Sequence, residues 1–493
     1  MPSAIIPADF FSRRRAGVLL HLTSLPSHCD NCCGDLGPEA YRFLAFLAAA
    51  GFSVWQMLPI GPTHSDGSPY QTLSVHAGSS DLISLELLLQ RGWLQVNELQ
   101  LPRAEALAAA ARYFAHALNT DAALSAKFTA FCADNAFWLD DYTLFIALRE
   151  AHGNISWLDW PAPLRRRDRA ALIVAQRQCA ERIAALQFEQ FVFFGQWQLL
   201  RAAAQRLDIA LFGDLPIFVA HDSAEVWARQ ELFLLDADGA PLTVAGVPPD
   251  YFSETGQRWG NPHYNWERMR ADHFTWWLGR MRLQLRCFDL IRIDHFRGFE
   301  AYWEIPATSA TAIEGRWVQA PGAALLAEFV REFPQLSLVA ENLGVITPEV
   351  EALREQFQLP GMLVLQFAFD GSRDNPYVPH RHKARAVVYT GTHDNDTTLG
   401  WYNQLDETTR NRVHDYLGHP REHMPRPLLR AALASVASLA IVPMQDLLEL
   451  DSAHRMNTPG TSTGNWRWQF DWSQVGDELS GRLQHWLHLY GRK

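Results

Sequence analysis

Three acidic side chains stand where apolar, β-rich runs of the sequence end. Asp294 follows LIRI, Glu341 follows LVA, and Asp394 lies in TGTHDN. A single carboxylate at such a position is often only the cap of the following helix. Three carboxylates in one cleft raise one another's pKa, so that one can be ionised while another keeps its proton. Retaining glycoside chemistry requires that pair, a nucleophile and a general acid.

Basic side chains accompany these acids. Arg292 precedes Asp294 by two residues, so both point to the same side of a strand, and we expect the guanidinium to keep Asp294 ionised. His295 and His393 each adjoin an aspartate, a pairing that a metal-dependent hydrolase would also use. Neither belongs to an HxH or HExxH pattern, and HCDNCC (28–33) has no second Cys/His pair at zinc-site spacing. We therefore expect no metal and no other cofactor.

Other functions are disfavoured by composition and by missing motifs. No G-x-S-x-G motif directly follows a predicted strand, as a nucleophile elbow requires, since GTSTG (460–464) lies well beyond the strand at 440–446, and there is no Gly-rich phosphate cradle. Its 43 Lys and Arg against 54 Asp and Glu give a net charge of −11, which argues against nucleic acid and anionic membrane as partners. No signal peptide or apolar stretch of membrane-spanning length is evident. Six cysteines in 493 residues do not form a disulfide scaffold, so we expect a reduced, cytoplasmic protein.

The elements that must position the acids form a regular series. Between the apolar runs lie helical patterns, near 40–47, 323–333, 348–357 and 427–438. Alternation of strand and helix predicts a parallel sheet, and eight strands close a (β/α)8 TIM barrel, whose active site lies at the carboxyl ends of the strands. The eight predicted strands are 17–24, 53–59, 208–216, 289–295, 337–342, 361–367, 386–394 and 440–446.

The spacing of these strands is uneven, which predicts large insertions. We expect a single catalytic barrel unit over 1–493, with a mainly helical insertion at 61–205 and another insertion at 215–286. Within the second, 244–266 has almost no periodicity and is dense in Pro, Gly, Asn, Tyr and Trp, which is typical of a functional loop over a cleft. About 47 residues follow the eighth strand, too few for a separate C-terminal β-domain.

Several ordered motifs carry a family resemblance. RIDHFRG (292–298), VAENLG (339–344) and TGTHDN (390–395) resemble the α-amylase clan. Further stretches are similar to the 4-α-glucanotransferases of glycoside hydrolase family 77, the amylomaltases or disproportionating enzymes, and together they cover nearly the whole chain: SPYQ (68–71), WLDDYTLF (138–145), GDLPIFVAHDSAEVW (213–227), the 244–266 loop, FAFDG (367–371), NPYVPH (375–380) and NTPGT-TGNW (457–466). One departure is Asn342, where the family usually has Asp.

The resemblance implies a role for each matching residue. Asp294 would be the nucleophile, Glu341 the general acid/base, and Asp394 the group that grips sugar hydroxyls near the transition state. It also implies substrate-binding positions at Arg292, His393, Tyr70, Asp214, Asp250, Tyr251, Phe252, Trp259, Asp370 and Asn465. The role of His295 is open, because strand alternation would turn it away from Asp294.

The implied reaction is transfer of an α-1,4-glucan segment from a glucan donor to the 4-hydroxyl of a glucose or maltooligosaccharide acceptor, in maltooligosaccharide, starch or glycogen metabolism. An α-glucan hydrolase or a debranching-type transferase would share the three carboxylates and is the main alternative. A non-catalytic glucan-binding protein would keep the aromatic residues without the acids. All three acids are present, so we expect an enzyme.

Overall fold

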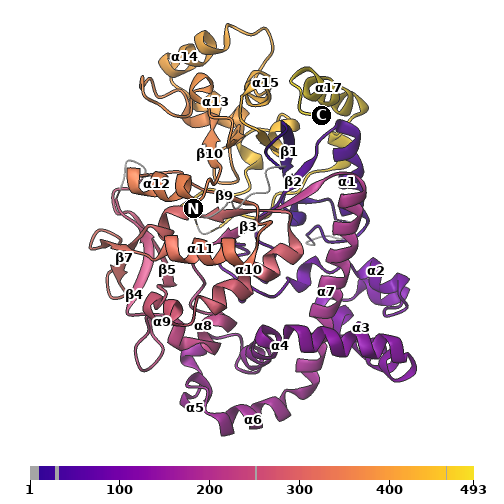
Figure 1. Cartoon of the computed structure of the whole chain (residues 1–493). Helices are drawn as coiled ribbons and strands as arrows, with labels where there is room; N and C mark the ends of the chain where they lie inside the picture. The colour runs from indigo at the N-terminus through magenta and orange to yellow at the C-terminus, as the bar shows by residue number, and fades with distance from the viewer. Residues whose placement is uncertain (1–9, 28–32, 250–252, 462) are drawn as a thin grey trace.

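Eight parallel strands form the centre of the computed structural model, which describes residues 10–27, 33–249, 253–461 and 463–493 (Figure 1). All eight strands predicted from the sequence are present, with shorter bounds. In spatial order they are β10 (Gly361–Val364), β11 (Ala386–Tyr389), β12 (Leu439–Pro443), β1 (Arg15–Leu19), β2 (Val54–Gln56), β3 (Ala210–Pro216), β6 (Leu290–Asp294) and β9 (Leu338–Ala340).

The two ends of this sheet meet, so that the strands form a nearly closed barrel. The backbone N–H of Ala340 donates to the carbonyl of Pro360, just before β10, over 2.9 Å. Asn342 continues the seam, because its Oδ1 accepts from the N–H of Met362 at 2.8 Å and its Nδ2 donates to Glu351 at 2.7 Å. An aspartate at 342 could accept the first bond but could not donate the second. Asn342 therefore makes a hydrogen bond to Glu351 that the usual aspartate could not make.

Apolar residues on both faces explain why these segments are strands. Val54, Phe212 and Leu290 belong to the cluster that fills the barrel. Their neighbours in sequence, such as Trp55 and Ile291, belong to the larger cluster between the strands and the surrounding helices. Strands buried on both faces are the signature of a parallel sheet covered by helices. Alternation also places Arg292 and Asp294 on the side of Leu290, toward the barrel interior.

Helices surround the barrel, as the sequence predicts. The helices that correspond to the four predicted segments are α1 (Pro38–Ala50), α11 (Gly322–Glu332), α12 (Pro348–Gln356) and α15 (Arg426–Ala434). The other helices of the barrel and of the C-terminal part are α8 (Ala224–Ala228), α9 (Trp266–Ala271), α10 (Thr275–Cys287), α13 (Thr398–Gln404), α14 (Glu407–Leu417), α16 (Met444–Leu447) and α17 (Asp477–Leu489). After β12 the described chain forms helices and loops without a further strand, in agreement with the predicted lack of a C-terminal β-domain.

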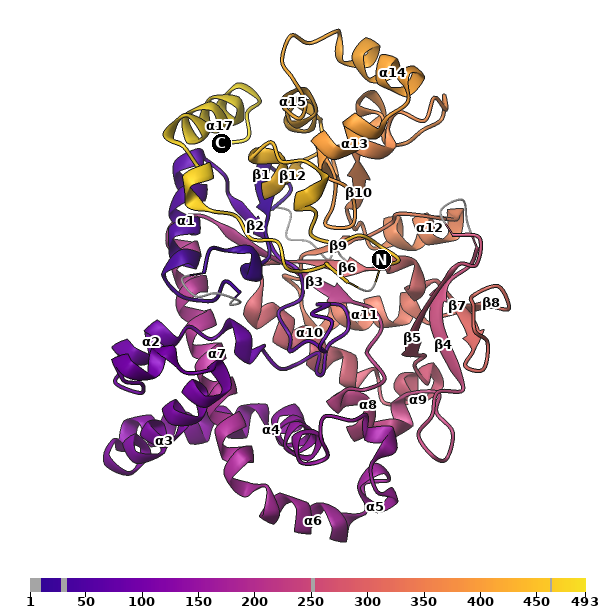
Figure 2. The same ribbon diagram turned by 180° about the vertical axis from the view of Figure 1, so that it is seen from behind.

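The segment between β2 and β3 is mainly helical and extends to one side of the barrel (Figure 2). Its helices pack against one another through aromatic side chains, among them Phe114, Trp138 and Phe188, which belong to the same buried cluster as Trp55 of the barrel. The helices are α2 (Leu85–Gln90), α3 (Arg103–Thr120), α4 (Ala122–Ala151), α5 (Ala162–Arg165), α6 (Arg169–Gln178) and α7 (Ala180–Arg206). In the described part of the chain, no helix is long and apolar enough to cross a membrane.

A small antiparallel sheet corrects the expectation that 244–266 lacks regular structure. Residues 244–247 and 257–262 of that segment are strands, and two later strands complete the sheet in the order β5-β4-β7-β8. The pairing is irregular between Val244 and Gly246, and β7 comes from a distant part of the sequence. Short strands that are held by pairing with distant residues often show little alternation of apolar and polar residues in their own sequence. The strands are β4 (Thr243–Val247), β5 (Gln257–Pro262), β7 (Ala301–Pro306) and β8 (Arg316–Gln319).

Candidate active site

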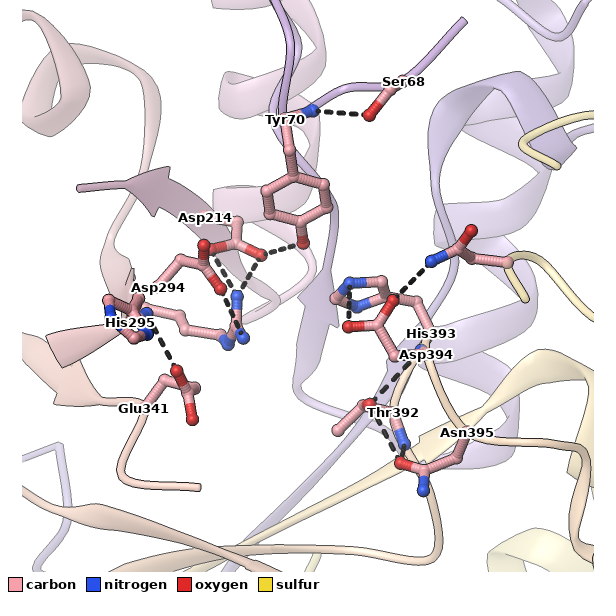
Figure 3. A network of polar contacts seen from close by, with 12 residues as sticks. Ser68, Tyr70, Asp214, Asp294, His295, Glu341, Thr392, His393, Asp394 and Asn395 are labelled. Atoms are coloured by element: carbon pink, nitrogen blue, oxygen red, sulfur yellow. Dashed lines mark hydrogen bonds and ion pairs between the residues drawn. The ribbon is translucent and has the colours of Figure 1, made fainter. Parts of the chain in front are cut away.

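The fold brings most of the candidate residues to one end of the barrel (Figure 3). Asp294 is the last residue of β6, and Glu341 follows β9 directly. Parallel strands present their carboxyl ends at the same rim, so residues far apart in sequence meet there. The group consists of Tyr70 from the segment after β2, Asp214 from β3, Arg292 and Asp294 from β6, Glu341 after β9, and His393 and Asp394 after β11.

The guanidinium of Arg292 joins two carboxylates at the centre of the site. Its Nη1 donates to both oxygens of Asp214, at 2.8 and 2.7 Å, and its Nη2 lies 2.8 Å from Oδ1 of Asp294. Tyr70 donates its hydroxyl to Oδ2 of Asp214 over 2.7 Å. Because the Asp214 side chain is 0% exposed, a sugar hydroxyl could reach it only by displacing one of these partners. Asp214 therefore fixes Arg292 and Tyr70.

Asp294 and Glu341 both bind a proton more tightly than an exposed carboxyl does. Burial raises the pKa of Asp294 to about 7, although the guanidinium of Arg292 opposes the shift. Burial also raises the pKa of Glu341, against Arg292 and two backbone N–H groups. The predicted ion pair between Arg292 and Asp294 is present, but burial outweighs it. Raised pKa values in two neighbouring carboxyls favour a state in which one is ionised while the other keeps its proton.

A tight turn after β6 orients Glu341. The strand ends at Asp294, and His295 adopts a left-handed conformation with φ 52°, so strand alternation no longer applies to it. The backbone N–H of His295 donates to Oε2 of Glu341 at 2.8 Å, and that of Leu343 donates to Oε1 at 2.6 Å. A non-glycine residue in this conformation is strained and is typical of functional sites. His295 thus acts on the site through its backbone.

Asp394 has the opposite electrostatic environment. Its Oδ2 lies 3.3 Å from Nε2 of His393, and its Oδ1 accepts from the side-chain amide of Asn457 at 2.6 Å. The Asp394 side chain is 49% exposed, and His393 and Asn457 together hold its pKa well below the usual range. The pKa of His393 is raised in turn, because the charge of Asp394 outweighs burial. Each partner therefore favours the charged form of the other, in contrast to Asp294 and Glu341.

Aromatic rings line the site beside these charges. The Tyr70 and His393 rings are stacked, with centroids 5.2 Å apart and planes at 16°. Trp466 lies 6.0 Å from each of them. On the other side, Trp259 of β5 contacts His295 edge-on, at 4.9 Å between centroids. Flat apolar faces next to hydrogen-bonding groups fit sugar rings, which have apolar C–H faces and polar rims.

The remaining predicted positions lie apart from the carboxylate cluster. Asp370 is exposed, and its Oδ1 accepts from the backbone of Ser372 and the side chain of Asn375, which holds its own loop together. Asn465 bonds Thr458 and Thr461 in the same way, and so supports the loop that carries Trp466. The predicted positions Asp250, Tyr251 and Phe252 lie outside the described residues.

The sequence reasoning did not single out Asn457 or Trp466. Both lie in NTPGT-TGNW, the stretch that also holds Asn465, and no local pattern indicates which of its residues turn toward Asp394. Among the described residues, no group of three or more His, Cys, Asp or Glu side chains is arranged to hold a metal ion. Within HCDNCC, Cys29 and Cys32 lie outside the described residues, and Cys33 donates to the carbonyl of Asp81 at 3.7 Å.

Comparison with known proteins identifies the family. A family model described as 4-alpha-glucanotransferase matches residues 20–474. The chain is 48% identical over 491 residues to the 4-alpha-glucanotransferase of Thermus thermophilus, covering 96% of this chain and 97% of that protein. It is 42% identical over 501 residues to a chloroplastic/amyloplastic 4-alpha-glucanotransferase of Arabidopsis thaliana, covering 98% and 86%.

The fold agrees with this result. An amylomaltase from Streptococcus agalactiae, solved in complex with acarbose, superimposes with a TM-score of 0.94 at 34% identity, and the match covers 97% of this chain and 100% of the other. Sequence and structure agree along nearly the whole length. The chain therefore belongs to the 4-alpha-glucanotransferase family, glycoside hydrolase family 77, as its motifs indicated.

Proposed function

We propose that this 4-α-glucanotransferase moves a segment of an α-1,4-glucan to the 4-hydroxyl of an acceptor glucose or maltooligosaccharide by retaining double displacement. The observation that carries the proposal is the pair Asp294 and Glu341, one partly buried and one buried carboxyl of raised pKa beside one guanidinium. A pair that shares one proton supplies both a nucleophile and an acid. The starch, glycogen and maltose setting and the cytoplasmic location predicted from the sequence remain part of the proposal.

In the first half-reaction Asp294 attacks C1 of the donor sugar. The bond between C1 and the glycosidic oxygen breaks, and Glu341 gives its proton to that oxygen, which leaves as the 4-hydroxyl of the released sugar. The ion pair with Arg292 favours charge on Asp294 and hence the proton on Glu341 in the reactive state. The product is a β-glucosyl ester of Asp294.

In the second half-reaction Glu341, now ionised, removes the proton from the 4-hydroxyl of the acceptor. That oxygen attacks C1, the ester bond to Asp294 breaks, and the configuration at C1 is that of the donor. Asp394, held ionised by His393 and Asn457, is placed to bind hydroxyls of the reacting sugar. Charge that is fixed before the reaction stabilises the transition state without reorganisation.

Transfer also requires that a sugar compete with water for the intermediate. We assign this role to the loop over 244–266, from which the ring of Trp259 would cover the intermediate and exclude solvent. The position of Trp259 against His295 supports this assignment. The products formed from maltotriose show directly whether a sugar or water attacks the intermediate. Glucose together with longer oligosaccharides indicates transfer, whereas shorter sugars alone would support the hydrolase alternative and sink the proposal.

Substitution of the two carboxyls tests their roles. We expect Asp294→Asn and Glu341→Gln each to lower disproportionation of maltotriose by at least about a thousandfold, since each removes a group that the chemical steps require. Asp374→Asn is the matched control, because that side chain is 92% exposed and lies on a surface loop. Near-normal turnover in either carboxyl variant, with a normal thermal transition, would show that the assignment is wrong.

A further inference from the structure

Trp317 differs from the other tryptophans of the chain. All eighteen lie in the described residues, and Trp317 of β8 is the one exposed ring among them, with 39% of its surface open to solvent. Two further large apolar side chains near it are also exposed: Ile313, in the turn before β8, at 53%, and Val345 at 57%. Exposed apolar side chains that gather in one region can mark a site of interaction.

The Trp317 ring is held in a fixed orientation. The guanidinium carbon of Arg297 lies 3.6 Å from the ring centroid, and the ring of Trp303, its partner across the β7/β8 ladder, lies 5.1 Å away at 64°. Trp303 is anchored in turn, because its indole N–H donates to the carbonyl of Ala312 at 2.9 Å. A ring fixed before binding loses little entropy when a ligand stacks on it.

Polar groups beside the ring fit a sugar. Gln319 follows Trp317 by two residues in β8, so it lies on the same face of the strand, and it is exposed. Its amide both donates and accepts, as a hydroxyl does. Arg316 lies on the opposite face and pairs with Glu304 at 2.7 Å. The face that carries Trp317 therefore combines a flat apolar ring with an uncharged hydrogen-bonding group, which suits a neutral carbohydrate better than an ionic ligand.

This surface is connected to the catalytic carboxyls by two short segments. Arg297, beneath Trp317, comes three residues after Asp294, and it donates to the carbonyl of Val345, four residues after Glu341. Figure 2 shows β8 beside β7 at the margin of the molecule, on the same side as α12, the helix that follows this loop. The ligand that these links suggest for this surface is therefore the same α-glucan that reacts at Asp294 and Glu341.

We propose that Trp317 and Gln319 form an accessory binding site for the α-glucan chain, which holds sugar units of a long substrate beyond those bound at Asp294 and Glu341. The proposal rests on the proposed function, because it concerns the same substrate. A short oligosaccharide occupies the catalytic positions alone, whereas a long chain also reaches the Trp317 surface. The contribution of Trp317 therefore depends on the length of the glucan.

The test compares two substrates in the full-length enzyme. We expect Trp317→Ala to raise the ratio of KM for long-chain amylose to KM for maltotriose by about twofold to tenfold, the loss of one aromatic stacking contact. Trp317→Phe, which keeps a flat ring, should have a KM ratio close to that of the wild type. Leu242→Ala is the matched control, since Leu242 is 55% exposed beside β4 of the same sheet and should leave the ratio unchanged. An unchanged ratio in Trp317→Ala would overturn the proposal.

Binding without turnover provides the second measurement. In the Glu341→Gln background, native electrophoresis in gels that contain amylose should show less retardation for Trp317→Ala than for the Trp317 parent. Equal retardation would overturn the accessory site while leaving the proposed function intact. Failure of the wild-type enzyme to disproportionate maltotriose would instead overturn the proposed function, so the two failures are distinguishable.

Discussion

At the scale of single residues, the site works by contrast between two kinds of carboxyl. Glu341 is buried and Asp294 partly buried, with too little compensating charge, so their pKa values are raised, whereas Asp394 has His393 and Asn457 as partners and its pKa is lowered. Similar chemical groups thus receive different protonation states from their surroundings. The same burial has a cost in stability, which can be measured.

Folding raises the pKa of Asp294 to about 7, from about 4 in an unfolded chain. A group whose pKa is raised by folding favours the folded state below its unfolded pKa, and this contribution is lost as the pH rises through the folded pKa. Asp294→Asn cannot ionise. We therefore expect its Tm, relative to that of the wild type, to be about 1–3 °C more favourable at pH 8 than at pH 5.

The measurement is calorimetry of both proteins at the two pH values. Asp374→Asn serves as the control, because its side chain is 92% exposed and its effect should be the same at both. A Tm difference for Asp294→Asn that does not change with pH would contradict the raised pKa. The comparison does not depend on activity, which this variant is expected to lose.

At the scale of elements, close packing of β3 positions Asp214. The strand contains Gly213, where an added methyl group would overlap the ring of Phe288, a side chain that is only 1% exposed. Phe288 lies just before β6, the strand that carries Arg292 and Asp294. The absence of a side chain at 213 therefore sets the spacing between β3 and β6, and with it the contact between Asp214 and Arg292.

We expect Gly213→Ala to destabilise the protein by about 1–3 kcal/mol, because the overlap forces β3 and Phe288 apart in a packed core. Activity should fall as well, since Asp214 moves with the strand. The matched variant is Gly195→Ala, in the exposed face of α7, where an added methyl group meets nothing within 4 Å. That change should stabilise the protein by about 0.5–1 kcal/mol. Chemical denaturation measures both, and equal effects would refute the argument.

At the scale of the whole molecule, a residue next to the C-terminus joins elements that are far apart in sequence. Arg492 is 1% exposed, and it donates to the carbonyls of Leu433 at 2.6 Å, Arg15 at 2.7 Å and Ser435 at 2.8 Å. One buried guanidinium therefore connects the C-terminus to the start of β1 and the end of α15. The shared core of barrel and helical insertion supports our proposal that the chain is a single unit.

We expect Arg492→Met to lower the free energy of unfolding by about 2–4 kcal/mol, because it leaves several buried carbonyls without a donor. If the chain is one unit, unfolding should remain a single transition that moves to lower denaturant concentration. Lys493→Ala, at the exposed neighbouring residue, is the control and should have little effect. Two separate transitions would instead indicate that the insertion at 61–205 folds independently.

The sequence by itself determined the barrel, the family and the three acids at strand ends. Strands buried on both faces carry a strong local signal, and Arg292 and Asp294 share a face by alternation alone. Tertiary structure decided the rest. It buried Asp214 against Arg292, brought Asn457 to Asp394 across 63 residues, and paired β4 with β7. It also raised the pKa of Asp294 despite Arg292. Burial and non-local contact depend on the whole fold, and no local pattern of residues contains them.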